Sequence, residues 1–183
     1  MAITIVVETG AGLSNSNSYV TVAEADTYNE DHYYGSAWAA LSEENKKRAI
    51  IFATRLLDEQ VEWTGTPRKS TDTSISDYQS LRWPRSSVVD VDGYAVDFQI
   101  IPEWLKNATS ELARYLSASD RTAEPATAGY SKLSVGSISV DVDKNDQLPT
   151  MPKSVVQMIT DYGRIKFGNT VKLLRAWYGF NSY

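Results

Sequence analysis

A glycine-rich turn near the N-terminus is the first feature with the residue types needed for chemistry. Gly10-Ala11-Gly12 follows a β-branched run from Ile3 to Val7, which predicts a short strand and then a turn. Such a pattern is typical of dinucleotide-binding loops, in which glycines let the backbone approach a pyrophosphate. Asn15 stands where the third glycine is needed, and the next expected helix begins too late to face the phosphates. We therefore interpret the turn as structural.

A second group has the spacing of metal ligands. Asp141, Asp143 and Asn145 match the opening of a calcium-binding loop, but Asp146 replaces the turn glycine and Pro152 stands where a bidentate glutamate belongs. A charged, solvated exit from a hairpin is the better interpretation. The chain has no cysteine, which excludes disulfides, thiolate metal sites and cysteine nucleophiles. We expect no metal and no cofactor.

The single histidine, His32, is the remaining candidate for catalysis. It could be combined with Ser14, Ser16 or Ser18 into a triad, yet no nucleophile elbow and no orienting acid accompany these serines. A histidine on the surface of a helix is the simpler interpretation. The sequence therefore predicts a protein that is not an enzyme.

The C-terminal segment has the clearest binding chemistry, because basic and aromatic residues alternate there. These residues are Lys172, Arg175, Trp177, Tyr178, Phe180 and Tyr183. They could stack on bases and contact phosphates, dock into another protein, or pack on their own domain. We favour the protein interface and leave the other two alternatives open.

The charge distribution bears on the nucleic-acid alternative. The 183 residues carry a net charge of −5, but the stretch from Gly163 to Tyr183 holds four basic residues and no acidic one, which leaves −9 for the remainder. Sequence-independent nucleic-acid binding draws most of its free energy from Lys and Arg that neutralise phosphates. The acidic body therefore argues against tight binding of this kind.

The elements that must position these residues are mostly helices. Capping and proline signals predict helices over about residues 22–33, 43–59, 102–117 and 152–165, followed by a short last helix that contains Val171, Leu174 and Tyr178. Turn signals predict hairpins over residues 87–98 and 131–142 and a mobile loop over 64–80. The expected fold class is mainly α: a small bundle of about four to five helices with one or two short β-hairpins.

Two further expectations concern organisation. We expect a core domain over residues 1–150 and a C-terminal helical segment over 151–183 that serves as a docking arm. Trp83 interrupts a polar region and is expected to anchor it in the core. Arg82 and Arg85 flank this tryptophan and are candidates for contact with a partner.

Four short signatures in fixed order carry a family resemblance: residues 12–26, Leu81-Arg82-Trp83-Pro84-Arg85, Ile101-Pro102 and Glu111-Leu112-Ala113. Together with Val135-Gly136-Ser137-Ile138-Ser139-Val140, they resemble the small neck proteins of tailed phages. These are head–tail adaptors, also called head-completion or connector proteins, and some relatives are labelled DnaT-like single-stranded-DNA-binding proteins. The resemblance extends from about Gly10 to Asp141.

The resemblance implies a mostly helical structural protein of the virion, made in the host cytoplasm. It implies a ring, most simply twelvefold, that binds the portal on one side and a stopper or tail component on the other, with an extended C-terminal segment reaching the portal. Double-stranded DNA would pass through the ring without specific binding. No membrane partner is expected, since the apolar run from Ile3 to Val7 is too short to span one. The alternative is an accessory protein of replication that binds single-stranded DNA.

Overall fold

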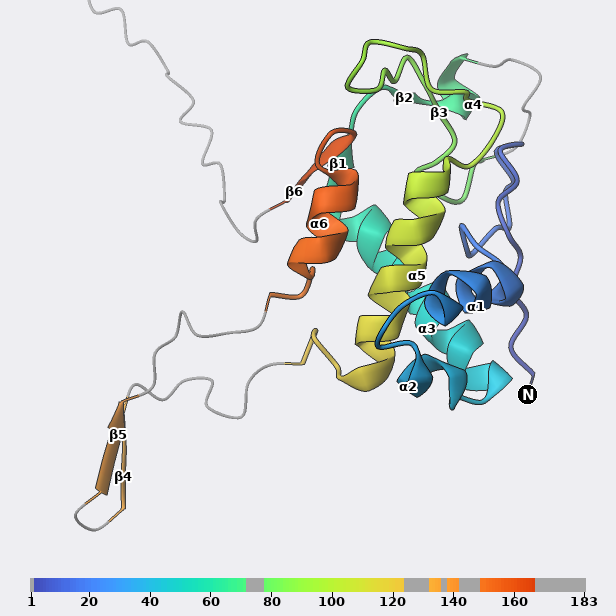
Figure 1. Cartoon of the computed structure of the whole chain (residues 1–183). Helices are drawn as coiled ribbons and strands as arrows, with labels where there is room; N and C mark the ends of the chain where they lie inside the picture. Colours follow the sequence, from blue (N-terminus) through green and yellow to red (C-terminus); the bar gives the residue numbers. More distant parts are fainter. Residues whose placement is uncertain (1, 72–77, 124–131, 136–137, 142–148, 167–183) are drawn as a thin grey trace, which may run out of the picture.

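The computed structural model describes residues 2–71, 78–123, 132–135, 138–141 and 149–166 (Figure 1). Its helices are α1 (Val22–Glu30), α2 (Ser36–Ala39), α3 (Glu43–Gln60), α4 (Arg68–Thr71), α5 (Glu103–Ala118) and α6 (Lys153–Ile159). The long helices α3 and α5 pack against each other, α1 and α2 cover one end of this pair, and α6 packs along α5. The predicted fold class, mainly helical with short β pairings, is confirmed.

The two central helices begin at the predicted residues and bury the predicted faces. Ser42 caps α3 by accepting a hydrogen bond from the Asn45 backbone N–H at 3.4 Å. Pro102 precedes the first residue of α5, where a missing N–H removes no helical hydrogen bond. Small and apolar residues recur at helical spacing on the facing sides and are buried: Ile50, Ala53 and Leu57 in α3, and Leu105, Ala108 and Leu112 in α5.

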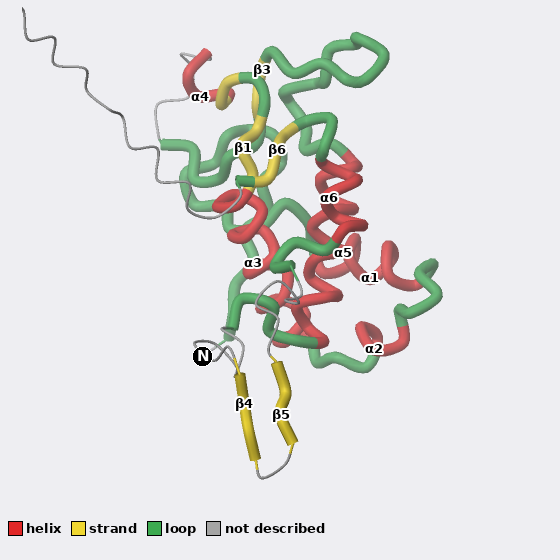
Figure 2. The backbone as a smooth tube through the Cα atoms, turned by 90° about the vertical axis from the view of Figure 1, so that its left-hand side faces the viewer, coloured by secondary structure: helices red, strands yellow, loops and turns green. Residues whose placement is uncertain are grey.

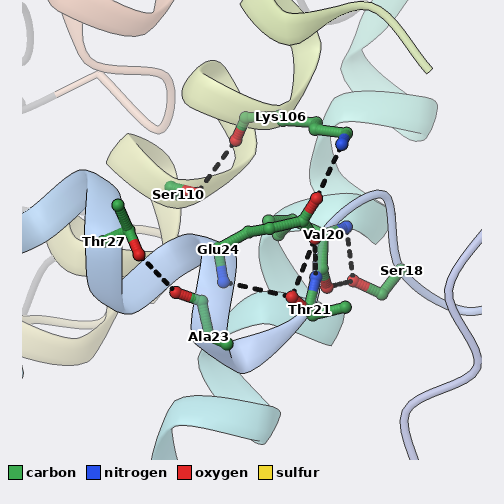
Figure 3. Close-up of polar contacts among 8 residues, drawn as sticks. All are labelled: Ser18, Val20, Thr21, Ala23, Glu24, Thr27, Lys106 and Ser110. Atoms are coloured by element: carbon green, nitrogen blue, oxygen red, sulfur yellow. Dashed lines mark hydrogen bonds and ion pairs between the residues drawn. The ribbon is translucent and has the colours of Figure 1, made fainter.

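The capping box predicted for the first helix is present (Figure 3). Glu24 donates its backbone N–H to the Thr21 hydroxyl at 3.1 Å, and the Glu24 carboxylate accepts the Thr21 N–H at 2.8 Å. The other carboxylate oxygen of Glu24 binds the Lys106 ammonium at 2.6 Å, which ties α1 to α5. The helix ends at Glu30, earlier than predicted, because the chain folds back closely: a Cβ on Gly35 would lie 1.9 Å from the Asn29 carbonyl oxygen.

Short antiparallel strand pairs accompany the helices in the described part of the chain (Figure 2). The pairs are β1 (Val61–Trp63) with β6 (Gly163–Ile165), β2 (Thr66–Pro67) with β3 (Arg85–Ser86), and β4 (Lys132–Val135) with β5 (Ile138–Asp141). Of these, β4 and β5 form the predicted hairpin around Gly136. The other two pairs join segments far apart in the chain, for which local sequence patterns carry no signal.

Two predicted elements are shorter in the structure. The helix that begins after Pro152 ends at Ile159, not at Ile165, since Gly163 turns the chain into β6. A Cβ on Gly163 would lie 2.7 Å from Cγ1 of Val61, so a side chain there would block the pairing with β1. The predicted strand over residues 3–7 is reduced to one bridge, between Val7 and Ser18.

Two predicted loop regions also differ. The first expected hairpin, over residues 87–98, forms a single bridge between Val89 and Ala95 in place of two paired strands. Gly93 in its turn has a positive φ of 85°, as a hairpin turn requires. The predicted loop over 64–80 contains β2 and α4 in its described part. The pairing of β2 with β3 explains the difference, because residues 85–86 supply the partner strand from outside the loop.

The predicted boundary at residue 150 does not coincide with a break in packing. Met151, Val155 and Ile159 are buried in the same hydrophobic core as α3 and α5. The apolar face of α6 is therefore part of this core. The last predicted helix and the rest of the expected docking arm lie outside the described residues.

Four aromatic side chains join the helices to the strands at one end of the core. Trp83 is fully buried and meets Trp104 and Trp63 edge-on, with ring centres 5.2 and 6.0 Å apart. Trp104 stacks on Tyr162 with ring centres 4.0 Å apart. Within the described ranges, no helix is long and apolar enough to cross a membrane.

We predict that Trp83→Ala lowers the free energy of unfolding by about 3–5 kcal/mol, because it leaves a large cavity between Trp63 and Trp104. Urea denaturation followed by circular dichroism measures the change. Val91→Ala, at an exposed position, serves as the control. A loss below about 0.5 kcal/mol for Trp83→Ala, the range of surface substitutions, would contradict the anchoring role.

Candidate functional site

The segment Leu81–Arg85 is held to the core by a short chain of hydrogen bonds. The Tyr19 hydroxyl donates to Oδ1 of Asp58 at 2.5 Å and accepts the Trp83 backbone N–H at 3.1 Å. The Arg82 backbone N–H donates to Oδ2 of Asp58 at 3.0 Å. The Asp58 carboxylate on α3 thus holds the backbone N–H of Arg82 directly and that of Trp83 through the Tyr19 hydroxyl.

Burial changes the acidity of both groups in this chain. Burial raises the pKa of Asp58 to about 6, although the hydrogen bonds from Tyr19 and the Arg82 backbone act in the opposite direction. Burial, reinforced by the charge of Asp58, raises the pKa of Tyr19 well above its usual value. Tyr19 therefore remains a proton donor at neutral pH, and Asp58 remains the acceptor.

The two arginines that flank Trp83 have different environments. Arg85 is only 8 % exposed, and its guanidinium donates to the carbonyl oxygens of Thr64 and Gly65, each at 2.6 Å. Burial lowers the pKa of Arg85 below its usual value. Arg85 thus holds the turn between β1 and β2 and does not face outward. Arg82, in contrast, is exposed.

Arg82 lines an open groove of about 940 Å³. We call it the basic groove, and the cations that line it are Arg55, Lys69, Arg82 and Lys166. Tyr78 also lines the groove and is 74 % exposed, with the Lys69 ammonium 5.3 Å from its ring centre. Among the described residues of the lining, Asp58 and Glu59 are acidic and none is a histidine or cysteine that could serve in catalysis. The groove can contact phosphates and stack a base.

A second surface is apolar. The loop over residues 88–100, which we call the apolar loop, exposes Val89, Val91, Tyr94, Phe98 and Ile100 by between 39 % and 71 %. Its backbone is nevertheless ordered by its own side chains. Oδ1 of Asp90 accepts the N–H groups of Asp92 and Tyr94, and Oδ1 of Asp97 accepts that of Gln99. A structured loop that exposes several large apolar side chains is typical of a protein interface.

The signature Glu111-Leu112-Ala113 has a structural explanation in the contacts of its glutamate. Glu111 is 3 % exposed, and its carboxylate accepts hydrogen bonds from Arg114 at 2.7 Å and from the Ser154 hydroxyl at 3.2 Å. Tyr28 donates to it from α1 at 3.4 Å, and Nε2 of His32 lies 3.7 Å away. The carboxylate therefore joins α1, α5 and α6. His32 belongs to this polar cluster.

Sequence reasoning missed the residue that shapes the N-terminal turn. Glu8 is 1 % exposed, and its carboxylate accepts the backbone N–H groups of Gly10, Gly12 and Leu13 at 2.8 to 3.0 Å. It also accepts the Ser16 hydroxyl at 3.0 Å. An acid two residues before the first of two glycines was the available signal. The turn thus encloses a carboxylate of its own chain, in agreement with a structural role.

The C-terminal binding residues predicted from the sequence, from Lys172 to Tyr183, lie outside the described residues. So do Asp143 and Asn145 of the rejected calcium pattern. In the part of the chain that the structure describes, no group of three acidic or histidine side chains is placed to hold a metal ion.

The raised pKa of Asp58 predicts a pH-dependent contribution to stability. Between pH 4 and 6 the folded state holds a proton that the unfolded chain releases, so this contribution is complete below about pH 4 and is lost as the pH rises through 6. Asp58→Asn removes the titrating group and with it this pH dependence. We expect the free energy of unfolding of the native chain, minus that of the variant, to fall by up to about 3 kcal/mol between pH 4 and pH 7. Urea denaturation at both pH values tests this, and parallel pH profiles would contradict it.

Comparison with known proteins identifies a family. The family model described as "Putative DnaT-like ssDNA binding protein" matches residues 3–176. Neither the search of curated proteins nor the search of solved structures returns a match. The matched region includes the N-terminal turn, the anchored Leu81–Arg85 segment and all the helices of the described core. The chain therefore belongs to the family described as putative DnaT-like ssDNA-binding proteins.

Proposed function

We propose that this protein is a head–tail adaptor of a tailed phage, a structural subunit that binds other proteins around the DNA channel. The observation that carries the proposal is the apolar loop, which exposes five large apolar side chains on an internally hydrogen-bonded backbone. Single exposed apolar residues are ordinary, but a cluster on one ordered loop favours a protein partner. The four signatures that resemble neck proteins supply the class of partner.

The charge of the body supports the same proposal. The sequence isoelectric point is about 4.9, so the protein as a whole is negatively charged at neutral pH and repels phosphate. A ring of such subunits, twelvefold by resemblance, would let double-stranded DNA pass without retaining it. The portal protein would bind on one side and a stopper or tail component on the other. Lys172, Arg175 and the aromatic residues after them remain our candidates for the portal contact.

Co-sedimentation with DNA-filled, portal-bearing heads that lack neck proteins tests this function. We expect the full chain to pellet with the heads and to saturate. The double variant Val91→Ser/Tyr94→Ser, at two exposed positions of the apolar loop, should bind at least about tenfold more weakly, because interface anchors commonly contribute more than 1.4 kcal/mol each. Tyr33→Ser, at an exposed tyrosine outside this loop, is the control. Absence of saturable binding by the full chain would contradict the adaptor proposal.

A second function is favoured by the basic groove: binding of single-stranded DNA, as the family description states. The groove combines four cations with an exposed, cation-contacted tyrosine, which is the chemistry of sequence-tolerant single-strand binding. We place this function second because Asp58 and Glu59 lie in the same groove and the chain as a whole is acidic.

Fluorescence anisotropy with a labelled oligo-dT separates the two functions. The adaptor proposal predicts no binding at physiological salt. Single-strand binding predicts an affinity that falls as the salt concentration rises. In a plot of the logarithm of the binding constant against the logarithm of the salt concentration, each phosphate contact contributes about 0.7 to the slope. The triple variant Arg55→Ala/Arg82→Ala/Lys166→Ala would therefore reduce the magnitude of that slope by about 2. Arg48→Ala/Arg164→Ala, at two exposed cations outside the described lining of the groove, is the control, and by the same arithmetic it would reduce the magnitude of the slope by at most about 1.4 if these cations also contacted phosphate. Tight binding that only the triple variant loses would make the second function the correct one.

A further inference from the structure

The apolar loop carries negative charge among its apolar side chains. Its acidic residues are Asp90, Asp92 and Asp97, and residues 88–100 contain no Lys, Arg or His. Asp92 and Asp97 are exposed, as are the five large apolar side chains of the loop. The partner that fits this surface is therefore a segment that combines apolar side chains with positive charge.

The chain itself contains such a segment. Residues 167–183, which we call the C-terminal tail, include Lys172 and Arg175 and no acidic side chain. The large apolar side chains of the tail are Phe167, Val171, Leu173, Leu174, Trp177, Tyr178, Phe180 and Tyr183. The composition of the tail thus complements the loop in charge and matches it in apolar character.

The chain leaves the core close to the apolar loop. The Thr64 N–H donates to the Tyr162 carbonyl at 2.9 Å, just before β6 begins at Gly163. The residue after Thr64, Gly65, lies against the start of the loop, where an added Cβ would be 2.6 Å from Cγ2 of Val88. Figure 1 shows the loop at the end of the molecule where β1 and β6 pair.

The negative charge of the loop acts on the region from which the tail departs. Burial raises the pKa of Tyr162, and the charges of Asp90, Asp161 and Asp92 raise it further. A negative potential that disfavours a phenolate favours a cation. Basic side chains that follow β6 are therefore attracted toward the loop.

The tail is long enough to reach the loop without any movement of the core. The N–H of Lys166, the last described residue, donates to the Gln60 carbonyl at 2.7 Å. From Gln60, Gly65 at the base of the loop is at most about 18 Å away, the extended length of the intervening chain. The stretch from Lys166 to Trp177 spans up to about 36 Å when it is extended.

The basic groove is disfavoured as a site for the tail. The cations Arg55, Lys69 and Arg82 line this groove together with Lys166. Positive charges repel one another at short range, so the groove opposes a basic segment where the apolar loop attracts it.

From these observations we infer that the C-terminal tail docks on the apolar loop of its own chain in the free subunit. The apolar side chains of the tail cover those of the loop, and Lys172 and Arg175 lie near Asp92 and Asp97. The tether favours this contact over association of two copies, because it holds the tail at an effective concentration on the order of millimolar.

The inference goes beyond the adaptor proposal, since it concerns the subunit before assembly. The tail residues proposed to contact the portal and the loop proposed to contact other proteins then cover each other until a partner displaces one of them. The free chain in this way keeps its largest exposed cluster of apolar side chains out of water.

The absence of cysteine from the chain makes intramolecular disulfide trapping a direct test. The trap is the full-length double variant Val91→Cys/Trp177→Cys, oxidised mildly at low concentration without heads. We expect an intramolecular disulfide, seen as a shift on a non-reducing gel. The control is Tyr33→Cys/Trp177→Cys, whose first thiol replaces an exposed tyrosine outside the loop, and it should react at least about tenfold more slowly.

A charge reversal tests the complementarity of the contact. Adding Lys172→Glu/Arg175→Glu to the trap replaces attraction to the loop by repulsion. We expect the rate of disulfide formation to fall at least about threefold relative to the control that carries the same two substitutions, as expected for the loss of exposed ion pairs. Because both proteins then share the same thiol in the tail, the comparison cancels any change in its reactivity.

Three results would overturn the inference. The first is a trap rate at or below that of the control. The second is a disulfide-linked dimer without the intramolecular product, which would show that the tail docks on a second copy. The third is a trap rate that the charge reversal leaves unchanged relative to the control. Since no heads are present, each of these results leaves the adaptor proposal to the co-sedimentation test.

Discussion

The hydrogen bond between Tyr19 and Asp58 is the interaction on which the rest of the structure depends. It joins the N-terminal segment to α3, and through the backbone of Arg82 and Trp83 it holds the tryptophan against Trp63 and Trp104. Tyr19 is fully buried and Asp58 is partly buried, so the Tyr19 hydroxyl needs the Asp58 carboxylate as its acceptor, and this requirement constrains the path of the chain. The position of the basic groove, whose wall includes Asp58 and Arg82, follows directly from it.

Much of the helical fold could be predicted from local sequence. The Thr21–Glu24 capping box, Ser42 and Pro102 mark helix starts through interactions within a few residues, and all three mark them correctly. The pairing of β1 with β6 could not be predicted in this way, because it joins residues about a hundred positions apart. Gly163 was the one local clue, since its lack of a side chain permits that pairing.

The candidate surfaces were predicted less completely, and the reasons are physical. Arg82 and Arg85 flank the same tryptophan, and the sequence does not distinguish them. Only the fold shows that Arg85 is buried, where its guanidinium donates hydrogen bonds to the carbonyl oxygens of Thr64 and Gly65. The cations Arg55, Lys69 and Lys166 of the groove belong to separate elements, so no local sequence motif predicts the groove. The buried carboxylate of Glu111 is similarly explained by donors from distant segments, Tyr28 and Ser154, whereas the donors to Glu8 all lie within eight residues of it. The family signatures therefore mark residues that hold the fold together, whereas the exposed residues carry the proposed contacts.

A cryo-electron-microscopy reconstruction of the neck of the purified virion tests the central claim most directly, that this chain is a ring subunit which binds proteins through its exposed apolar surfaces. The account predicts a closed ring of this fold beneath the portal, with the loop over residues 88–100 buried against protein. A neck in which this fold is absent, in virions whose other neck components are resolved, would contradict the account. A ring in which that loop faces solvent would contradict the role assigned to it.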